Sequence, residues 1–279
     1  MRRAGIDLGG AAAKYAAVSR NALSDALAWR SGLVLGLGAS AGRVLMALAL
    51  WSAVFSGRRE IGGMGLAAVA SYYLVAVFVA QIDRSSSMVE VFAREIRAGE
   101  FAKYLARPVD PLAWFLASCL GRSAFQAALT VVATATCAVA FSEFLVPPDP
   151  AGLLAASVVA ASGLLSLALI NFMTSILAFA FQDVASFNIG KNCLVEFLSG
   201  SLLPLALLPG WARRVLELTP FPALASLPAE FVLGPGRGGR GLEELPTVLL
   251  GLALWNLALF IAARRAFAAL SSRYEEAGS

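Results

Sequence analysis

Residues that could carry out catalysis are few in this chain, and their spacing does not form an active site. The sequence contains no histidine, which excludes His-based catalytic triads and the usual His-ligated metal centres. The segment Asn188–Asn192 contains a Gly-Lys pair, but Ala185 and Asn192 stand where a phosphate-binding loop requires Gly and Ser or Thr. Glu243 and Glu244 are adjacent in a polar loop and poorly placed for acid–base work. We therefore expect a chain without catalytic residues, metal ligands or a cofactor of its own.

Three ionisable side chains, Arg43, Arg122 and Glu196, fall inside apolar segments, and Asn171 adds a polar group to another. Because a charge within a bilayer is costly, we expect Glu196 to form an ion pair with Arg122 or Arg43. Two alternatives stay open: side chains that reach up to the membrane surface, and direct contact with a substrate or proton. Arg43 is expected within the bundle or at the interface with another subunit. Asn171 is expected to join helices. No series of carboxylates crosses the apolar segments, which disfavours a secondary transporter.

The composition indicates an all-α polytopic membrane protein. Hydrophobic residues make up 59% of the 279 residues, charged residues only 14%, and the mean hydropathy is +0.75. A spanning helix needs about 20 apolar residues, and six segments qualify: about 31–55, 62–82, 112–141, 151–181, 185–208 and 246–266. No long polar stretch remains for a second domain, so residues 1–279 are expected to form one six-helix bundle. The net charge of +4 is dispersed, which argues against a nucleic-acid partner.

The distribution of Lys and Arg predicts the orientation of these six segments. One side would carry Arg2, Arg3, Lys14, Arg20, Arg30, Arg84, Arg94, Arg97, Lys103, Arg107, Lys191, Arg264, Arg265 and Arg273, and the other Arg58, Arg59, Arg213, Arg214, Arg237 and Arg240. Because basic residues accumulate on the cytoplasmic side, both termini and the loop over 83–111 are expected in the cytoplasm.

Residues 1–30 are predicted to contain an amphipathic helix that lies in the membrane surface. Between Lys14 and Trp29, apolar residues recur at helical spacing, at Tyr15, Val18, Ala22, Ala26 and Trp29. The alternative is a cytoplasmic extension of the first spanning helix.

The charged loop over 83–111 has the signals of a preformed docking element. Ser87 and Glu90 fit a capping box, and Met88, Phe92 and Ile96 recur on one helix face. Gly99 is a helix stop, and a second short helix, Glu100–Leu105, is expected to end before the Arg107-Pro108 pair. Five acids balance five bases, which favours binding to a protein over adhesion to anionic lipid. The alternative is a solvated loop.

Residues 209–245 are predicted to form short helices that dip back into the outer side of the membrane. Prolines at 204, 209, 220, 222, 228 and 235 exclude one continuous helix. The windows Trp211–Leu218 and Ala223–Leu233 are helical in pattern, too short to span and too apolar for a free loop. The run "GPGRGGRG" is expected to be a flexible, exposed turn.

Two segments resemble one family of transporters. "FAREIRAGEFAKYLARPVDPLAWF" is similar to the Glu-Ile-Arg-x-Gly … Leu-x-Arg-Pro segment of six-span, type-2 ATP-binding-cassette (ABC) exporter permeases, in the subfamily grouped with viologen and drug exporters. "FLSGSLLPLALLPGWARRVLELTPFPALASLPAEFVLG" resembles the proline-rich run of the same subfamily, and the first segment ending "LWSAVF" also fits.

The resemblance implies a permease of the bacterial cytoplasmic (inner) membrane that exports a substrate. It would pair with a second permease, identical or homologous, and with two copies of an ABC ATPase that bind ATP and Mg²⁺. The residues of ATPase coupling would be Glu95, Ile96, Arg97, Gly99, Glu100, Phe101, Tyr104, Leu105 and Arg107, and those of the outer gate Pro204, Pro209, Trp211, Pro220, Phe221 and Pro222. A membrane scaffold or assembly subunit that docks a different partner is the alternative from another class.

Overall fold

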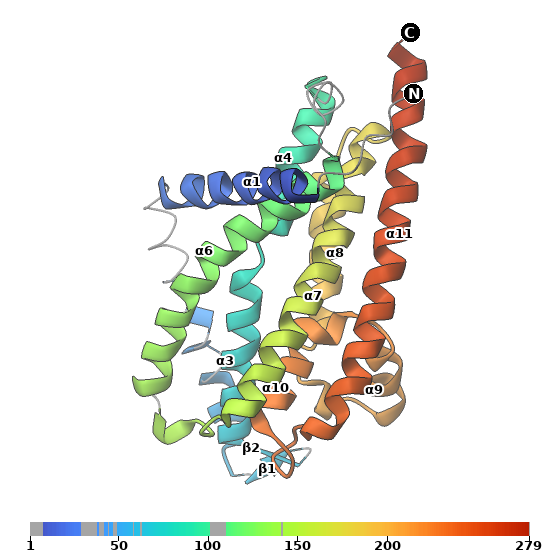
Figure 1. Cartoon of the computed structure of the whole chain (residues 1–279). Helices are drawn as coiled ribbons and strands as arrows, with labels where there is room; N and C mark the ends of the chain where they lie inside the picture. Colours follow the sequence, from blue (N-terminus) through green and yellow to red (C-terminus); the bar gives the residue numbers. More distant parts are fainter. Residues whose placement is uncertain are drawn as a thin grey trace.

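The computed structural model of the chain describes residues 8–28, 38, 42–43, 45–46, 49–57, 59–61, 63–100, 110–140 and 142–278. This part of the chain consists of helices joined by turns and loops, with one antiparallel pair of two-residue strands, β1 (Glu60–Ile61) and β2 (Met64–Gly65). The long helices run side by side along one axis, and the strand pair lies at one end of the bundle (Figure 1). The prediction of an all-α bundle is confirmed.

Four helical stretches in the described residues are long and apolar enough to cross a membrane. They are α3 (Leu66–Ile82) continued by α4 (Ser85–Arg97), α6 (Pro111–Ala140), α7 (Pro150–Ile176) continued by η2 (Leu177–Phe179), and α11 (Leu245–Gly278) continuing η5 (Leu242–Glu244). These match the segments predicted over 62–82, 112–141, 151–181 and 246–266. Much of the segment over 31–55 lies outside the described residues, so the count of six spans stays a prediction.

The fifth predicted span is wrong as one continuous helix. Helix α8 (Ala185–Ser199) has 15 residues and ends at Gly200, whose φ of +83° is the left-handed conformation that favours glycine. The hydroxyl of Tyr72 on α3 donates to the Gly200 carbonyl at 2.7 Å, and that of Tyr73 donates to the Leu202 carbonyl at 2.6 Å. Two side chains of a distant helix therefore hold the backbone where α8 stops, short of a membrane's thickness.

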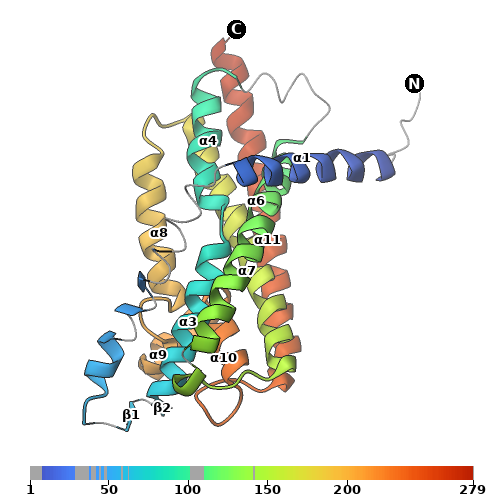
Figure 2. The same cartoon turned by 90° about the vertical axis from the view of Figure 1, so that its left-hand side faces the viewer.

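Helix α1 (Leu8–Ala28) lies across the bundle rather than along it, as both views show (Figures 1 and 2). Ala22 is buried and Tyr15 and Val18 are half-buried. Helix α1 crosses α6 closely, because a Cβ at Gly121 would collide with the backbone of Ser19. The predicted helix is confirmed and begins earlier than Lys14, while Trp29 lies outside the described residues.

Two ends of the bundle differ in what they carry. One end bears α1, the last turn of α4 and the end of α11 (Figures 1 and 2). The opposite end bears β1, β2, α9 (Gly210–Glu217) and α10 (Ser226–Leu233). Helix α8 starts on the side of the first end, and the chain reaches the second end through η3 (Leu205–Leu207). The interrupted segment over 185–217 thus still runs from one end of the bundle to the other.

Candidate functional site

Helix α4 is capped by a residue that the sequence pattern did not indicate. The Asp83 carboxylate accepts hydrogen bonds from the backbone N–H and hydroxyl of Ser85 and from those of Ser86. Ser87 instead donates to the Arg84 carbonyl inside the helix, at 2.8 Å. The predicted capping box of Ser87 and Glu90 is therefore wrong, because the helix has already begun at Ser85 and the free N–H groups are those next to Asp83.

The other end of α4 has the predicted glycine stop. Gly99 has a φ of +73°, its N–H donates to the Ile96 carbonyl at 3.2 Å, and the Glu100 N–H donates to the Glu95 carbonyl at 3.1 Å. These two bonds form a Schellman motif, which closes the helix end. The coupling residues Phe101, Tyr104, Leu105 and Arg107, with most of the predicted helix Glu100–Leu105, lie outside the described residues.

One face of α4 is fixed in the core. Met88, Phe92 and Ile96 are each at most 1% exposed, which confirms the predicted face. The Phe92 ring lies 5.8 Å from that of Phe115 on α6 and 5.7 Å from that of Phe172 on α7, centre to centre. Aromatic rings at this spacing attract beyond their area of burial. Helices α6 and α7 therefore hold α4 in one orientation.

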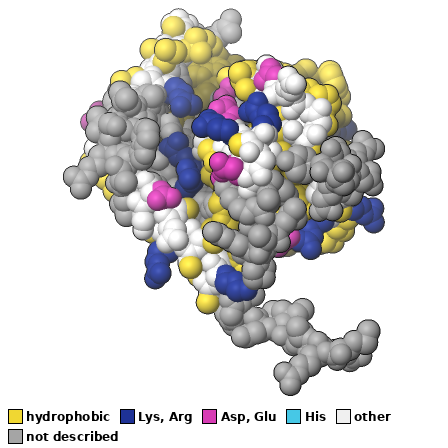
Figure 3. All heavy atoms as spheres, turned by 90° about the horizontal axis from the view of Figure 1, so that it is seen from above, with side chains coloured by type: hydrophobic (Ala, Val, Ile, Leu, Met, Phe, Trp, Pro, Cys, Tyr) yellow, Lys and Arg dark blue, Asp and Glu magenta, His cyan; other side chains and the backbone are white. Residues whose placement is uncertain are grey.

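The opposite face of α4 is exposed and charged. Its exposed side chains are Ser87, Glu90, Arg94 and Arg97, followed by Gly99 and Glu100, while Glu95 is half-buried. Seen from the end that carries α4, basic and acidic side chains are interleaved (Figure 3). Of the predicted coupling residues that the structure describes, Ile96 is buried beneath this surface and Glu95 is half-buried. Arg97, Gly99 and Glu100 are exposed on it.

Arg97 joins α4 to the turn before α8. Its guanidinium donates to the Gln182 carbonyl at 2.6 Å. The next residue, Asp183, accepts from the Ser186 hydroxyl and from its N–H at 3.2 Å, and these bonds hold the pKa of Asp183 below its ordinary value. The end of α4 and the start of α8 thus form one connected surface.

A polar cluster links the start of α4 to α7 and α8. Asn171 on α7 is fully buried, and its amide donates to the hydroxyls of Ser85 at 2.6 Å and Ser86 at 3.3 Å. The Lys191 ammonium on α8 donates to the carbonyl oxygen of the same amide. This confirms that Asn171 joins helices. Asn188, also on α8, donates to the Ser86 carbonyl at 3.3 Å. The contacts of Ser85, Ser86 and Lys191 were not predicted. The available signal was the spacing of Asn188 and Lys191, which are three residues apart and therefore share a helix face.

The expected ion pair of Glu196 is absent from the described part of the chain. Glu196 is exposed, and its backbone carbonyl accepts from the Ser199 and Ser201 hydroxyls. Arg43 is also exposed. Arg122 on α6 has a buried Nε without a hydrogen-bond partner. None of the ion pairs formed by the described residues joins Glu196 to either arginine.

The proline-broken region forms the short helices that were predicted. Helix α9 follows Pro209, η4 (Phe221–Leu224) follows Pro220, and α10 is buried at every residue. Two glycines of α7 permit this burial: a Cβ at Gly152 would collide with the Phe231 carbonyl, and one at Gly163 with Ala223. Of the predicted gate residues, Pro204, Pro220 and Pro222 are buried, Phe221 is half-buried, and Pro209 and Trp211 are exposed.

An ion-pair network closes this proline-broken region, and sequence analysis missed it. Glu230 on α10 is only 2% exposed, and its carboxylate accepts from Arg240 Nε at 2.6 Å and from Arg213 at 3.4 Å. Glu217 bridges the same two arginines, and Glu244 also pairs with Arg240. Burial raises the pKa of Glu230, and the arginines offset this only in part. A single Glu in the apolar window Ala223–Leu233 was the available signal.

The network corrects the prediction of a flexible turn over 234–241. Residues 235–237 are exposed, but Gly238, Gly239 and Arg240 are half-buried. The Arg240 N–H donates to the Glu230 carbonyl at 3.0 Å. A Cβ at Gly239 would collide with the backbone of Glu230 and Gly234, and one at Gly238 with the Met64 side chain. The glycines therefore permit close packing against α10 and β2.

Comparison with known families supports a membrane transporter. The family model described as "ABC-2 family transporter protein" matches residues 42–278, from before β1 to the end of α11. None of the curated proteins compared with the chain matches it.

Proposed function

The chain belongs to the ABC-2 transporter family, and on that premise we propose that it is the permease subunit of an ABC exporter of the bacterial inner membrane. It is a multi-pass membrane protein, and in this proposal the energy comes from ATP hydrolysed by a separate ATPase subunit. Two ATPase copies and a second permease, identical or homologous, complete the transporter.

The observation that carries the proposal is the fixed position of α4. Its buried face is held by Phe115 and Phe172, its first turn by Asp83 and its last by Gly99. Its outer face presents charges of both signs. A rigid helix with a charged surface suits contact with a partner that pushes on it, because a flexible loop would absorb the displacement. In this proposal the ATPase binds the surface around Arg94, Arg97, Gly99 and Glu100.

The contacts of α4 provide a route by which a push would reach the rest of the bundle. Ser85 and Ser86 bind Asn171, which binds Lys191 on α8. Helix α8 leads to the turn that Tyr72 and Tyr73 hold, and from there to η3 and α9. ATP-driven closure of the ATPases would bias these elements between two arrangements and so open or close the outer region.

The proposed orientation places the end with α1, the last turn of α4 and the end of α11 in the cytoplasm. Helix α1 then lies at the cytoplasmic membrane surface, and η4 and α10 form re-entrant elements of an outer gate. The excess of Lys and Arg expected on the cytoplasmic side supports this orientation.

A charge reversal on α4 tests the proposal. The partner would be a soluble protein with a phosphate-binding loop encoded beside this chain, co-expressed and co-purified with it. We expect Arg94→Glu to abolish co-purification and the ATPase activity of the complex in proteoliposomes. The matched control is Arg214→Glu, an exposed arginine on α9 at the other end of the bundle. A complex that keeps full activity with Arg94→Glu would overturn the assignment.

A further inference from the structure

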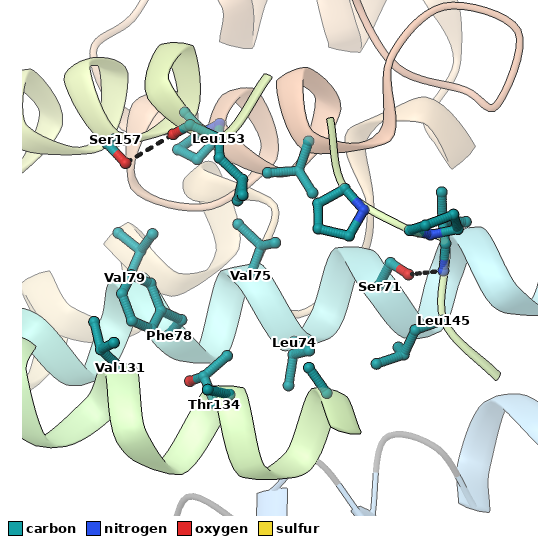
Figure 4. Close-up of a pocket in the computed structure, with 18 of the residues that line it drawn as sticks. Ser71, Leu74, Val75, Phe78, Val79, Val131, Thr134, Leu145, Leu153 and Ser157 are labelled. Atoms are coloured by element: carbon teal, nitrogen blue, oxygen red, sulfur yellow. Dashed lines mark hydrogen bonds between the residues drawn. The ribbon is translucent and has the colours of Figure 1, made fainter. Parts of the chain in front are cut away.

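A cavity of about 720 Å³ opens between α3, α6 and α7, away from the α4 surface. Figure 4 shows side chains from these helices converging on it, among them Leu74 and Phe78 of α3 and Val131 of α6. Pro228 and Val232 of α10 form another part of its wall. A volume of this size is typical of sites that hold a small-molecule ligand, about 300–1,000 Å³.

The lining specifies the chemistry of the occupant. The described residues that line the cavity include no charged side chain. Two of its hydroxyls are already bonded to backbone: Ser71 accepts from the Val146 N–H at 2.8 Å, and Ser157 donates to the Leu153 carbonyl at 2.7 Å. A polar headgroup would lose its hydrogen bonds with water and gain few in return. The cavity therefore selects hydrocarbon.

The opening of the cavity indicates where the occupant comes from. Val131 is 52% exposed and Leu153 is 45% exposed, and both line the cavity. They belong to α6 and α7, two of the helices long and apolar enough to cross the membrane. Their exposed surfaces face the bilayer once the protein is embedded, because apolar side chains on spanning helices are solvated by lipid. A hydrocarbon chain enters from the membrane without passing through water.

We propose that this cavity is a binding site for the hydrocarbon chain of a membrane amphiphile, whose headgroup stays at the membrane surface. The hydrocarbon chain enters between α6 and α7 and contacts α10, the helix that carries Glu230. The amphiphile is either a phospholipid of the bilayer or a single-chain amphiphile dissolved in it. The site requires only that the protein is embedded in a membrane, and it does not depend on ATPase binding to α4.

Photo-crosslinking tests the site directly. The full chain is placed in vesicles of phosphatidylcholine that contain a trace of phosphatidylcholine with a diazirine in one acyl chain, and the crosslinks are mapped by mass spectrometry. We expect labelling within residues 71–79 of α3 and 131–138 of α6. A second arm uses a diazirine fatty acid in the same vesicles. Labelling by the phospholipid identifies a bilayer lipid as the source, and labelling by the fatty acid alone identifies a single-chain amphiphile.

Two neighbouring substitutions on α6 provide the matched control. Ala138 lines the cavity, whereas Val139 is 78% exposed and does not line it. We expect Ala138→Phe to lower labelling about tenfold, the scale of discrimination when a hydrocarbon pocket no longer fits its ligand, and Val139→Phe to leave it unchanged. Phe78→Ala, which enlarges the cavity, should raise labelling. Equal labelling in all variants, or labelling confined to exposed residues outside the cavity, would overturn the proposal.

Discussion

Arg240 Nε lies 2.6 Å from a carboxylate oxygen of Glu230, a residue that is 2% exposed. This pair ties the glycine-rich turn to α10 and places a buried charge in the proline-broken region. A buried ion pair adds little net stability over apolar packing, but the removal of one partner leaves the other charge buried and uncompensated. Removal of Arg240 should therefore lower the stability of the folded protein.

We expect Arg240→Ala to destabilise the protein by about 3 kcal/mol, because it leaves the Glu230 carboxylate with only the longer contact to Arg213. Thermal unfolding in detergent, followed by tryptophan fluorescence, measures the effect. Arg237→Ala, at the exposed tip of the same turn, is the control and should change stability by less than about 0.5 kcal/mol. An equal effect of the two substitutions would mean that the network does not fix the turn.

The pH dependence of Glu230→Gln tests the raised pKa of Glu230. Stability tied to a carboxyl whose folded pKa is raised is fully present below its unfolded pKa, about 4.3, and is lost as pH rises through the folded pKa. Gln does not titrate, so Glu230→Gln should gain stability relative to the unsubstituted chain as pH rises from about 4 to 8. Unfolding temperatures of both proteins across this range provide the measurement. A difference that is constant, or that shrinks with rising pH, contradicts the assignment.

Gly99→Ala should weaken the coupling of α4. A φ of +73° costs a residue with a Cβ about 1 kcal/mol or more, so the Schellman end would loosen. We expect lower ATPase activity of the reconstituted complex and faster amide hydrogen exchange at Gly99 and Glu100. Gly190→Ala is the matched control, since Gly190 is inside helix α8 with open space around it. If Gly99→Ala leaves both readouts unchanged, the end of α4 is not part of the coupling surface.

Asn171→Ala should separate α4 from α8. It removes the amide shared by Ser85, Ser86 and Lys191 and leaves the half-buried Lys191 ammonium without this acceptor, at a cost of about 1–3 kcal/mol. Hydrogen exchange should rise in the first turn of α4 and around Lys191 together. Asn21→Ala, at an exposed position of α1, serves as the control. Faster exchange in only one of the two helices would show that the polar cluster does not couple the stability of α4 to that of α8.

The long helices and one face of α4 could be predicted because they follow from local pattern. Apolar length predicts α3, α6, α7 and α11, and the spacing of Met88, Phe92 and Ile96 predicts which side of α4 is buried. The start of α4 was predicted at the wrong residue. Asp83 and Ser87 can both cap a helix, and the sequence alone did not show which backbone N–H groups would be free.

The end of α8 and the ion-pair network of Glu230 could not be predicted, because both depend on distant partners. Residues 185–208 are apolar enough for a span, but Gly200 is held by Tyr72, 128 positions earlier. Arg240 and Glu230 are ten positions apart in the sequence and are joined by a turn. Helical spacing therefore does not predict that they pair. Glu196 was expected to pair because it lies in an apolar segment, yet the short helix leaves it exposed.

The turn at Gly200 also constrains how the protein is made. Backbone carbonyls that face hydrocarbon without a partner cost several kcal/mol each. The carbonyls of Gly200 and Leu202 have such partners in the hydroxyls of Tyr72 and Tyr73. Helix α3 precedes this turn in the chain, so N-to-C synthesis delivers the donors before the acceptors.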